Sequence, residues 1–204
     1  NTYLGACQHL TEDDIVEETI GASAITYMEG YLWDPPQAKK AFVKAAHYAH
    51  KNERAAAITL SDPFCVNRFR NEFLDLIKSK TMDYVFANIE EVKALYDTDD
   101  LNVAVRQLAE DAEIAAVTMG ARGAMAIKNG EIVSVPAFPV SNVVDVTGAG
   151  DLFASGFLLA TARGQSMEEA LKLGCLAASE VISHYGARPV ADLKALARGE
   201  GIAV

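Results

Sequence analysis

The stretch "NVVDVTGAGDLFASGFLLA", residues 142–160, places a glycine-rich turn between two carboxylates and in front of a helix-compatible segment. Asp145 ends the apolar run before the turn, and Asp151 follows the turn. The turn itself consists of small residues: Thr147, Gly148, Ala149 and Gly150. Because the residues up to about 162 predict a helix, the N–H groups of the turn and the positive helix end together predict an anion site.

A carboxylate beside an anion site needs a chemical reason, because it repels a bound phosphate. Phosphoryl transfer supplies one: N–H groups stabilise the charge on the transferring group, and a carboxylate accepts the proton of the attacking hydroxyl. This interpretation makes Asp151 a candidate base and Gly148, Ala149 and Gly150 candidate anion-hole residues. The alternative is a plain tight turn followed by an Asp that favours a helix N-terminus.

The whole chain of 204 residues predicts one α/β domain. Strand-like and helical segments alternate at short intervals, which predicts a doubly wound, mainly parallel sheet flanked by helices. Strands are expected at residues 22–33, 55–60, 83–87 and 113–119, followed by a hairpin at Asn129-Gly130. Ligands of such sheets bind beyond the carboxyl ends of the strands. The residues expected there are Asp62, Asn88, Gly120 and Asp145.

The composition of the chain argues against nucleic acids and membranes as binding partners. The chain has 18 basic and 28 acidic residues, a net charge of −10, so it is expected to repel nucleic acid and anionic membranes. No apolar run approaches the roughly 20 residues that cross a bilayer. The three cysteines are scattered without metal-site spacing, which predicts reduced thiols and a cytoplasmic protein.

Four stretches of the sequence together resemble one enzyme family. "DVTGAGDLFASGF", residues 145–157, resembles the C-terminal signature of the ribokinase-like, or PfkB, family of carbohydrate and nucleoside kinases, with Val146 where members often have Thr. "ANIEEV" matches the N-x-x-E element of that family with Asn88 and Glu91. "VTMGARGA" matches its T-x-G-x-x-G element, and "AASEVISHYGA" resembles its helix and turn beside the adenine.

The resemblance implies an ATP-dependent kinase with Mg²⁺ and a small-molecule nucleoside or sugar substrate. It makes Asp151 the catalytic base, and it places Asn88 and Glu91 near the triphosphate and its Mg²⁺, through water. It implies that Asp145 and the backbone around Thr147 form a loop for a monovalent cation such as K⁺. The other residues expected at the nucleotide are Thr118, Gly120, Gly123, Thr147 and Ala178.

Each of these assignments has a structural alternative. Asn88 and Glu91 have the spacing of a helix-capping box, which is compatible with a role at the nucleotide. Gly120 and Gly123 have the pattern of a strand-end turn, and Asp145 has that of a turn cap. Ala178 belongs to a face of small residues that suits either a flat purine or close packing against the sheet.

Within the family, "NTYLGACQHLTEDDI", "GYLW" and "LSDPF" most resemble adenosine kinases, so a nucleoside acceptor is expected and a ribose- or fructose-type sugar is the alternative. Two other classes stay open. One is a noncatalytic nucleotide-binding relative. The other is a dinucleotide oxidoreductase, although Phe153 occupies the third glycine position of its motif.

The chain begins "NTYLGA" without Met, whereas family members have a longer N-terminal portion with further strands and a lid. Residues 1–204 are therefore expected to form the C-terminal, ATP-binding portion of such a kinase. Without a lid to exclude water, this portion alone is expected to turn over poorly. The resemblance also implies a homodimer for the full-length protein, formed through its lids.

Overall fold

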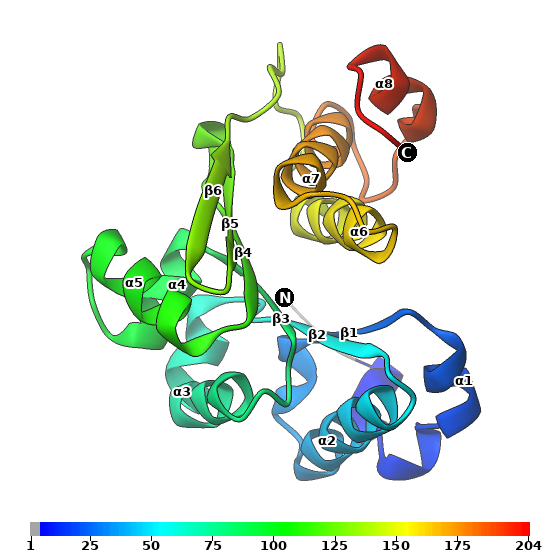
Figure 1. Cartoon of the computed structure of the whole chain (residues 1–204), viewed down its shortest axis with the longest axis vertical. Coiled ribbons are helices and arrows are strands. Elements are labelled where there is room, and N and C mark those ends of the chain that lie inside the picture. The colour runs from blue at the N-terminus through cyan, green and yellow to red at the C-terminus, as the bar shows by residue number, and fades with distance from the viewer. Residues whose placement is uncertain (1–4) are drawn as a thin grey trace. The chain divides into compact units, whose positions relative to one another are not determined.

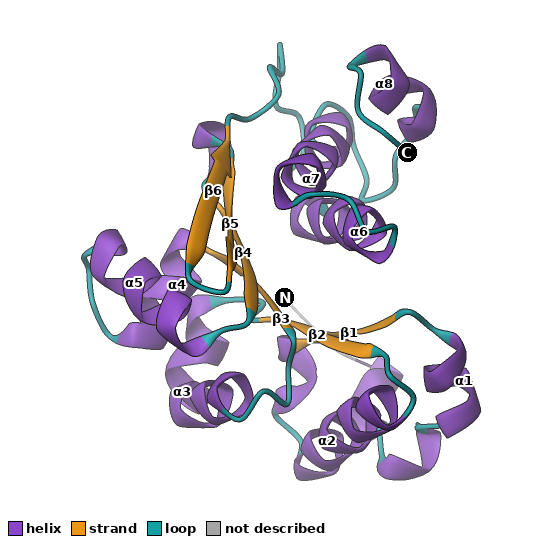
Figure 2. Ribbon diagram, in the orientation of Figure 1, coloured by secondary structure: helices purple, strands orange, loops and turns teal. Residues whose placement is uncertain are grey.

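The computed structural model describes residues 5–204, and the chain divides into two compact units. The first unit ends at Ala115, and the second runs from Ala116 to Val204. The division falls within strand β4 (Ile114–Thr118). Figure 1 labels the helices and strands, and Figure 2 distinguishes them by colour.

The first unit contains three parallel strands: β1 (Ile25–Glu29), β2 (Ala55–Thr59) and β3 (Tyr84–Asn88). Ile25 pairs with Ala55, and Ala57 pairs with Tyr84. The central residues of β2 and β3 are buried, which explains why both strands are continuously apolar. The helices of this unit are α1 (Glu17–Ala22), α2 (Pro36–Lys51), α3 (Pro63–Lys78), α4 (Ile89–Tyr96) and α5 (Leu101–Asp111).

Helix α2 packs against the sheet through the apolar face that its sequence periodicity predicts. Pro36 starts the helix, where its missing N–H costs nothing. One face consists of small apolar residues and packs on β1 and β2. The buried residues of this face are Ala38, Ala41, Phe42, Ala45, Ala46 and Ala49.

The first strand is shorter than the predicted range of residues 22–33, because the chain turns at Gly30. A Cβ atom there would lie 2.6 Å from the carbonyl oxygen of Thr59. Residues Gly30–Trp33 instead form a 3₁₀ turn. This turn buries Trp33, whose ring centroid lies 5.5 Å from that of Phe42 and 5.9 Å from that of Phe73.

The second unit contains an antiparallel hairpin and three helices. Strands β5 (Ala124–Lys128) and β6 (Glu131–Val135) pair with Ala124 opposite Val135. Asn129 and Gly130 join them with positive φ angles of 51° and 81°, which confirms the predicted two-residue turn. The helices are α6 (Ala149–Ala162), α7 (Met167–Val181) and α8 (Leu193–Gly199).

Helices α6 and α7 pack against each other at glycines. A Cβ atom on Gly156 would lie 2.7 Å from the carbonyl oxygen of Leu173, and one on Gly174 would lie 2.8 Å from that of Phe153. The small-residue face of α7 therefore makes a close helix–helix contact at Gly174, and α7 also packs against β5 and β6, as the packing alternative for this face predicted.

The chain as a whole has the predicted α/β fold. Its six strands follow the order β1-β2-β3-β4-β5-β6 in a mixed, mainly parallel sheet, with β5 and β6 antiparallel. Among residues 5–204, the helices are too short or too polar to span a bilayer.

Candidate active site

The glycine turn before α6 depends on glycine at position 148. Gly148 adopts the left-handed conformation, with φ 81° and ψ 1°, and α6 begins at the next residue. A Cβ atom at this position would lie 2.8 Å from the Cβ atom of Ala187 and 2.9 Å from its carbonyl oxygen. A side chain is therefore excluded both by backbone conformation and by contact with the segment that follows α7.

The first turn of α6 presents backbone donors beside a carboxylate. The Ala149 N–H donates to the Val146 carbonyl at 3.2 Å, but the amides of Gly150 and Asp151 have no acceptor among the described residues. Gly148 is the N-cap and has no side chain to accept from them. Asp151 is exposed in the same turn. The turn therefore has free N–H groups at Gly150 and Asp151 next to a solvent-accessible carboxylate, whereas the Ala149 N–H is bonded within the turn. The anion-hole role of Gly148, Ala149 and Gly150 stays a prediction.

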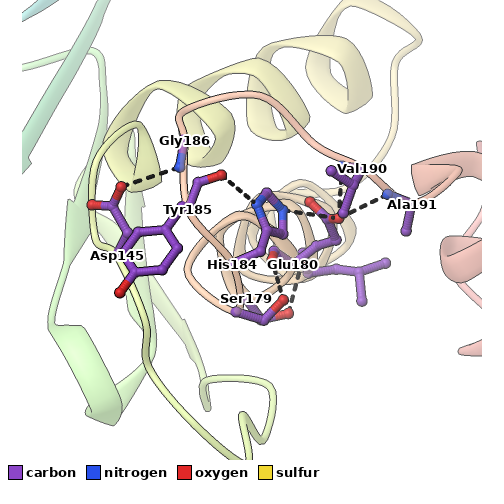
Figure 3. A network of polar contacts seen from close by, with 10 residues as sticks. Asp145, Ser179, Glu180, His184, Tyr185, Gly186, Val190 and Ala191 are labelled. Atoms are coloured by element: carbon purple, nitrogen blue, oxygen red, sulfur yellow. Dashed lines mark hydrogen bonds and ion pairs between the residues drawn. The ribbon is translucent and has the colours of Figure 1, made fainter.

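Asp145 organises the loop that leads into this turn. Its Oδ1 accepts from the Thr147 N–H at 2.9 Å and from Thr147 Oγ1 at 2.7 Å. Its Oδ2 accepts from the Gly186 N–H at 3.1 Å (Figure 3). The bonds from the Thr147 hydroxyl and amide, with that from the Gly186 amide, hold the pKa of Asp145 below its ordinary value.

The expectation that Asp145 follows a strand is wrong. Residues 143 and 144 lie in the loop after β6, and the last strand residue is Val135. The N–H groups of Val144 and Asp145 donate instead to the Ile182 carbonyl, at 2.8 Å and 3.4 Å. The apolar run before the turn thus attaches to the end of α7, because that helix end offers a free carbonyl.

The T-x-G-x-x-G element lies at the end of β4, where Thr118 is the last strand residue and Gly120–Arg122 form a 3₁₀ turn. Gly120 and Gly123 both have positive φ, of 59° and 93°. A Cβ atom on Gly120 would meet nothing within 4 Å among the described residues, so its backbone faces open space. A Cβ atom on Gly123 would lie 2.0 Å from the Val135 carbonyl oxygen, so this glycine accommodates the chain after β6.

Ala178 is half-buried near the end of α7, one turn before the Ile182 carbonyl that holds the Asp145 loop. It belongs to the same unit as the turn before α6.

In the first unit, Asn88 ends β3 and caps α4 in a complete capping box with Glu91. The Asn88 N–H and Nδ2 donate to the two Glu91 carboxylate oxygens at 2.8 Å and 2.6 Å, and the Glu91 N–H donates to Asn88 Oδ1 at 3.0 Å. Glu91 is 4% exposed. Burial raises its pKa to about 7, against the effect of the Asn88 backbone bond and with a smaller contribution from Asp62.

Sequence reasoning overlooked Glu180, a buried carboxylate (8% exposed) on α7 that accepts bonds from the segment ending at Ala191. The available signal was an acidic residue within the otherwise small and apolar "AASEVI" stretch.

Comparison with known proteins identifies the family. The profile of the pfkB family carbohydrate kinases matches residues 1–193. The chain belongs to the PfkB family. A probable sugar kinase from Rhizobium etli CFN 42 shares 49% identity with this PfkB chain, with a TM-score of 0.97 over 100% of this chain and 62% of that one. Adenosine kinase from Sinorhizobium meliloti shares 50% identity, with a TM-score of 0.95 over 98% and 61% of the two chains.

More distant PfkB-like structures support the fold alone. A putative ribokinase II from E. coli, in complex with ATP and Mg²⁺, has 18% identity and a TM-score of 0.86 over 98% of this chain and 66% of that one. Among curated relatives, Adenosine kinase 1 of Arabidopsis thaliana is 28% identical over 156 residues, which cover 68% of this chain and 44% of the relative. The chain thus spans less than half the length of that relative, and about three fifths of the length of the Rhizobium and Sinorhizobium proteins.

Proposed function

We propose that the full-length protein is an ATP-dependent kinase that phosphorylates a primary hydroxyl of an adenosine-like nucleoside. The observation that carries this proposal is the start of α6, where exposed Asp151 lies in the same turn as two backbone amides without acceptors among residues 5–204. That combination suits a reaction in which negative charge develops on a phosphoryl group while a hydroxyl loses its proton.

In the proposed reaction, the hydroxyl oxygen of the acceptor bonds to the γ-phosphorus of ATP, and Asp151 accepts the proton of that hydroxyl. The bond from that phosphorus to the bridging oxygen breaks, and ADP leaves with the electron pair. The free N–H groups of Gly150 and Asp151 supply donors for the charge on the transferring group, and Gly148 and Ala149 form the turn that presents them. Because the transition state is loose, a carboxylate is a sufficient base.

Mg²⁺ suits the Asn88–Glu91 pair only as a hydrated ion. Both Glu91 oxygens already accept bonds from Asn88, and residues 5–204 contain no cluster of three or more His, Cys, Asp or Glu side chains able to hold a metal. Mg²⁺ commonly keeps several waters and binds through phosphates and one or two carboxylates. We therefore assign Asn88 and Glu91 to the ion through water. When bound, Mg²⁺ supplies positive charge to the phosphates.

The remaining nucleotide and cation assignments follow the family motifs. Asp145 suits K⁺ because its side chain is only half-buried and its lowered pKa keeps it charged. Gly120 suits a nucleotide contact because open space adjoins its backbone. The other residues assigned to the nucleotide are Thr118, Gly123, Thr147 and Ala178.

The nucleoside acceptor is supported by the 50% identity with the Sinorhizobium adenosine kinase and by the "LSDPF" and "GYLW" stretches. A sugar acceptor is the second candidate, because the Rhizobium protein called a probable sugar kinase is 49% identical. These two identities are too similar to separate the candidates.

The test measures ATP consumption by the full-length protein with adenosine, inosine, ribose and fructose as acceptors. We expect turnover with adenosine, and a loss of at least about 10³-fold in kcat for Asp151→Asn, since removing a base costs this much or more. The matched control is Glu168→Gln, which removes an exposed first-turn carboxylate from the neighbouring helix α7 and should leave kcat unchanged.

Turnover with ribose or fructose would identify a sugar kinase. Turnover that survives Asp151→Asn would make Asp151 a helix-start residue and overturn the mechanism. Tight Mg-ATP binding without turnover on any acceptor would favour a noncatalytic nucleotide-binding protein.

A further inference from the structure

Glu180 is a charged side chain in an unfavourable place. It lies in the last turn of α7, where the helix dipole disfavours negative charge, and it is only 8% exposed. One carboxylate oxygen, Oε2, is buried without a hydrogen-bond partner among the described residues. An apolar residue would avoid these costs, so the interactions of Oε1 must account for the carboxylate.

Oε1 of Glu180 accepts three bonds from the segment that follows α7 (Figure 3). The donors are the Ala191 N–H at 2.8 Å, the Val190 N–H at 3.0 Å and His184 Nε2 at 3.3 Å. Burial by itself would raise the pKa of Glu180, but the bonds from Ala191 and Val190 hold it below its ordinary value. The side chain is therefore a carboxylate that clamps residues 184–191.

Apolar packing contributes little to holding this segment. Residues 185–191 are all exposed, and the two largest apolar side chains among them, Tyr185 and Val190, are 84% and 78% exposed. The conformation of the segment therefore depends on its polar bonds. One set of bonds runs from His184, Val190 and Ala191 to Glu180. The segment also contacts the loop before α6 through Gly186 and Ala187.

Two contacts join residues 184–191 to that loop. The Gly186 N–H donates to Asp145 Oδ2 at 3.1 Å, and Asp145 in turn holds the amide and hydroxyl of Thr147. Ala187 lies against Gly148, at the position where a Cβ atom on that glycine would collide. The segment thus bounds one side of the turn whose amides open α6.

We propose that Glu180 is a positioning residue for the anion-binding turn: it fixes residues 184–191, which hold Asp145 and Gly148 in the geometry that aims the amides of α6. This inference rests on the proposed kinase function. Glu180 itself touches neither the acceptor nor the phosphoryl group. Its removal should therefore lower kcat and leave acceptor binding almost unchanged.

The test compares Glu180→Leu and Glu180→Gln in the full-length protein, assayed well below the unfolding temperature of each variant. For Glu180→Leu we expect a 10- to 100-fold loss of kcat with a KM for the acceptor within twofold of the original. Glu180→Gln keeps a side-chain oxygen that accepts from Val190 and Ala191, so it should recover most of the lost kcat. The matched control is Glu169→Leu, which removes the capping carboxylate at the other end of α7. It should lower stability without changing kcat.

Amide hydrogen exchange gives a readout that does not depend on activity. The amides of Gly186 and Thr147 should exchange much faster in Glu180→Leu and slightly faster in Glu180→Gln, in which a neutral oxygen accepts more weakly, whereas the amides in the middle of α7 should exchange at the original rate in both variants. If Asp151→Asn abolishes turnover and Glu180→Leu keeps the original kcat, or if the Gly186 and Thr147 amides keep their protection, the positioning role is refuted and the kinase function stands. If Asp151→Asn stays active, the proposed function itself fails.

Discussion

Two glycines of the candidate site are required for different reasons. Gly148 needs both its positive φ and the absence of a Cβ atom, because Ala187 occupies the adjacent space. Gly120 needs only its positive φ, because a Cβ atom there would meet no described residue within 4 Å. A glycine with open space beside it is accessible to a ligand, whereas a glycine whose adjacent space is filled by the protein's own chain is a packing requirement.

Glu91 is the residue whose protonation most affects stability. Its folded pKa of about 7 lies above the ordinary value of 4.5, so the native state binds more protons than the unfolded state between these pH values. The stability that the protonated carboxyl contributes is complete below pH 4.5 and is lost as the pH rises through 7. We expect this loss to reach at most about 3 kcal/mol, since one pKa unit corresponds to about 1.4 kcal/mol.

Urea unfolding of wild type and Glu91→Gln at about pH 5 and about pH 8, in metal-free buffer, tests this prediction. The variant cannot titrate at this position, so its stability should fall less than that of wild type over the interval. Glu169→Gln is the control, because the pKa of half-buried Glu169 is lowered and its carboxylate is charged at both pH values. Equal pH dependence in wild type and Glu91→Gln would contradict the prediction.

At the scale of elements, the contact of α6 with α7 determines the second unit. The two helices meet where Gly156 and Gly174 let their backbones approach, and both helix ends then reach the site. The start of α6 carries Asp151, and the end of α7 binds the Asp145 loop through Ile182. A shift of one helix along the other would therefore move Asp151, the proposed base, relative to the Asp145 loop.

Gly174→Ala should destabilise the protein although alanine favours helices. The propensity gain is about 1 kcal/mol, but the new Cβ atom would lie 2.8 Å from the Phe153 carbonyl oxygen, which is backbone and cannot rotate away. Overpacking of this kind costs about 1–3 kcal/mol, so we expect a net loss of up to about 2 kcal/mol in the free energy of unfolding.

The matched variant is Gly199→Ala in α8, where the Cβ atom meets nothing within 4 Å among residues 5–204. Urea unfolding should find Gly199→Ala neutral or slightly stabilising and Gly174→Ala clearly destabilising. Similar stabilities for the two variants would mean that α6 and α7 separate without cost.

At the scale of the whole molecule, the net charge of −10 on this chain would have to coexist with the polyphosphate of the proposed ligand. Long-range electrostatics disfavour such a ligand, so its affinity has to come from local donors and from the cation it carries. The ligand is therefore expected to bind as a magnesium complex and not as the free nucleotide.

Thermal unfolding of the full-length protein tests this expectation. Mg-ATP at about 100 times its Kd should stabilise the native state by about 2.7 kcal/mol, whereas ATP with excess chelator should have a much smaller effect. NAD is the control for the oxidoreductase alternative, and we expect no shift with it. A saturable shift with NAD, or an equal shift with and without Mg²⁺, would contradict this prediction.

Local patterns in the sequence were sufficient for much of the structure. Two predicted features, the Asn129-Gly130 turn and the Asn88–Glu91 capping box, depend on residues within a few positions of each other. The same holds for the helix that follows the glycine turn. Alternation of strand and helix was enough for the fold class, and the resemblance of four short stretches to known motifs was enough for the PfkB family.

Only the tertiary structure decided how distant segments share the site. Three contacts join residues that no local pattern relates: the bond of Asp145 to Gly186, the bond of Glu180 to Ala191 and the contact of Ala187 with Gly148. The early end of β1 at Glu29 likewise depends on a contact with a distant strand. The physical reason is that a short-range pattern fixes backbone conformation. The pairs of carboxylates and amides that form hydrogen bonds depend on how the helices pack, and contacts such as Gly174 against Phe153 determine that packing.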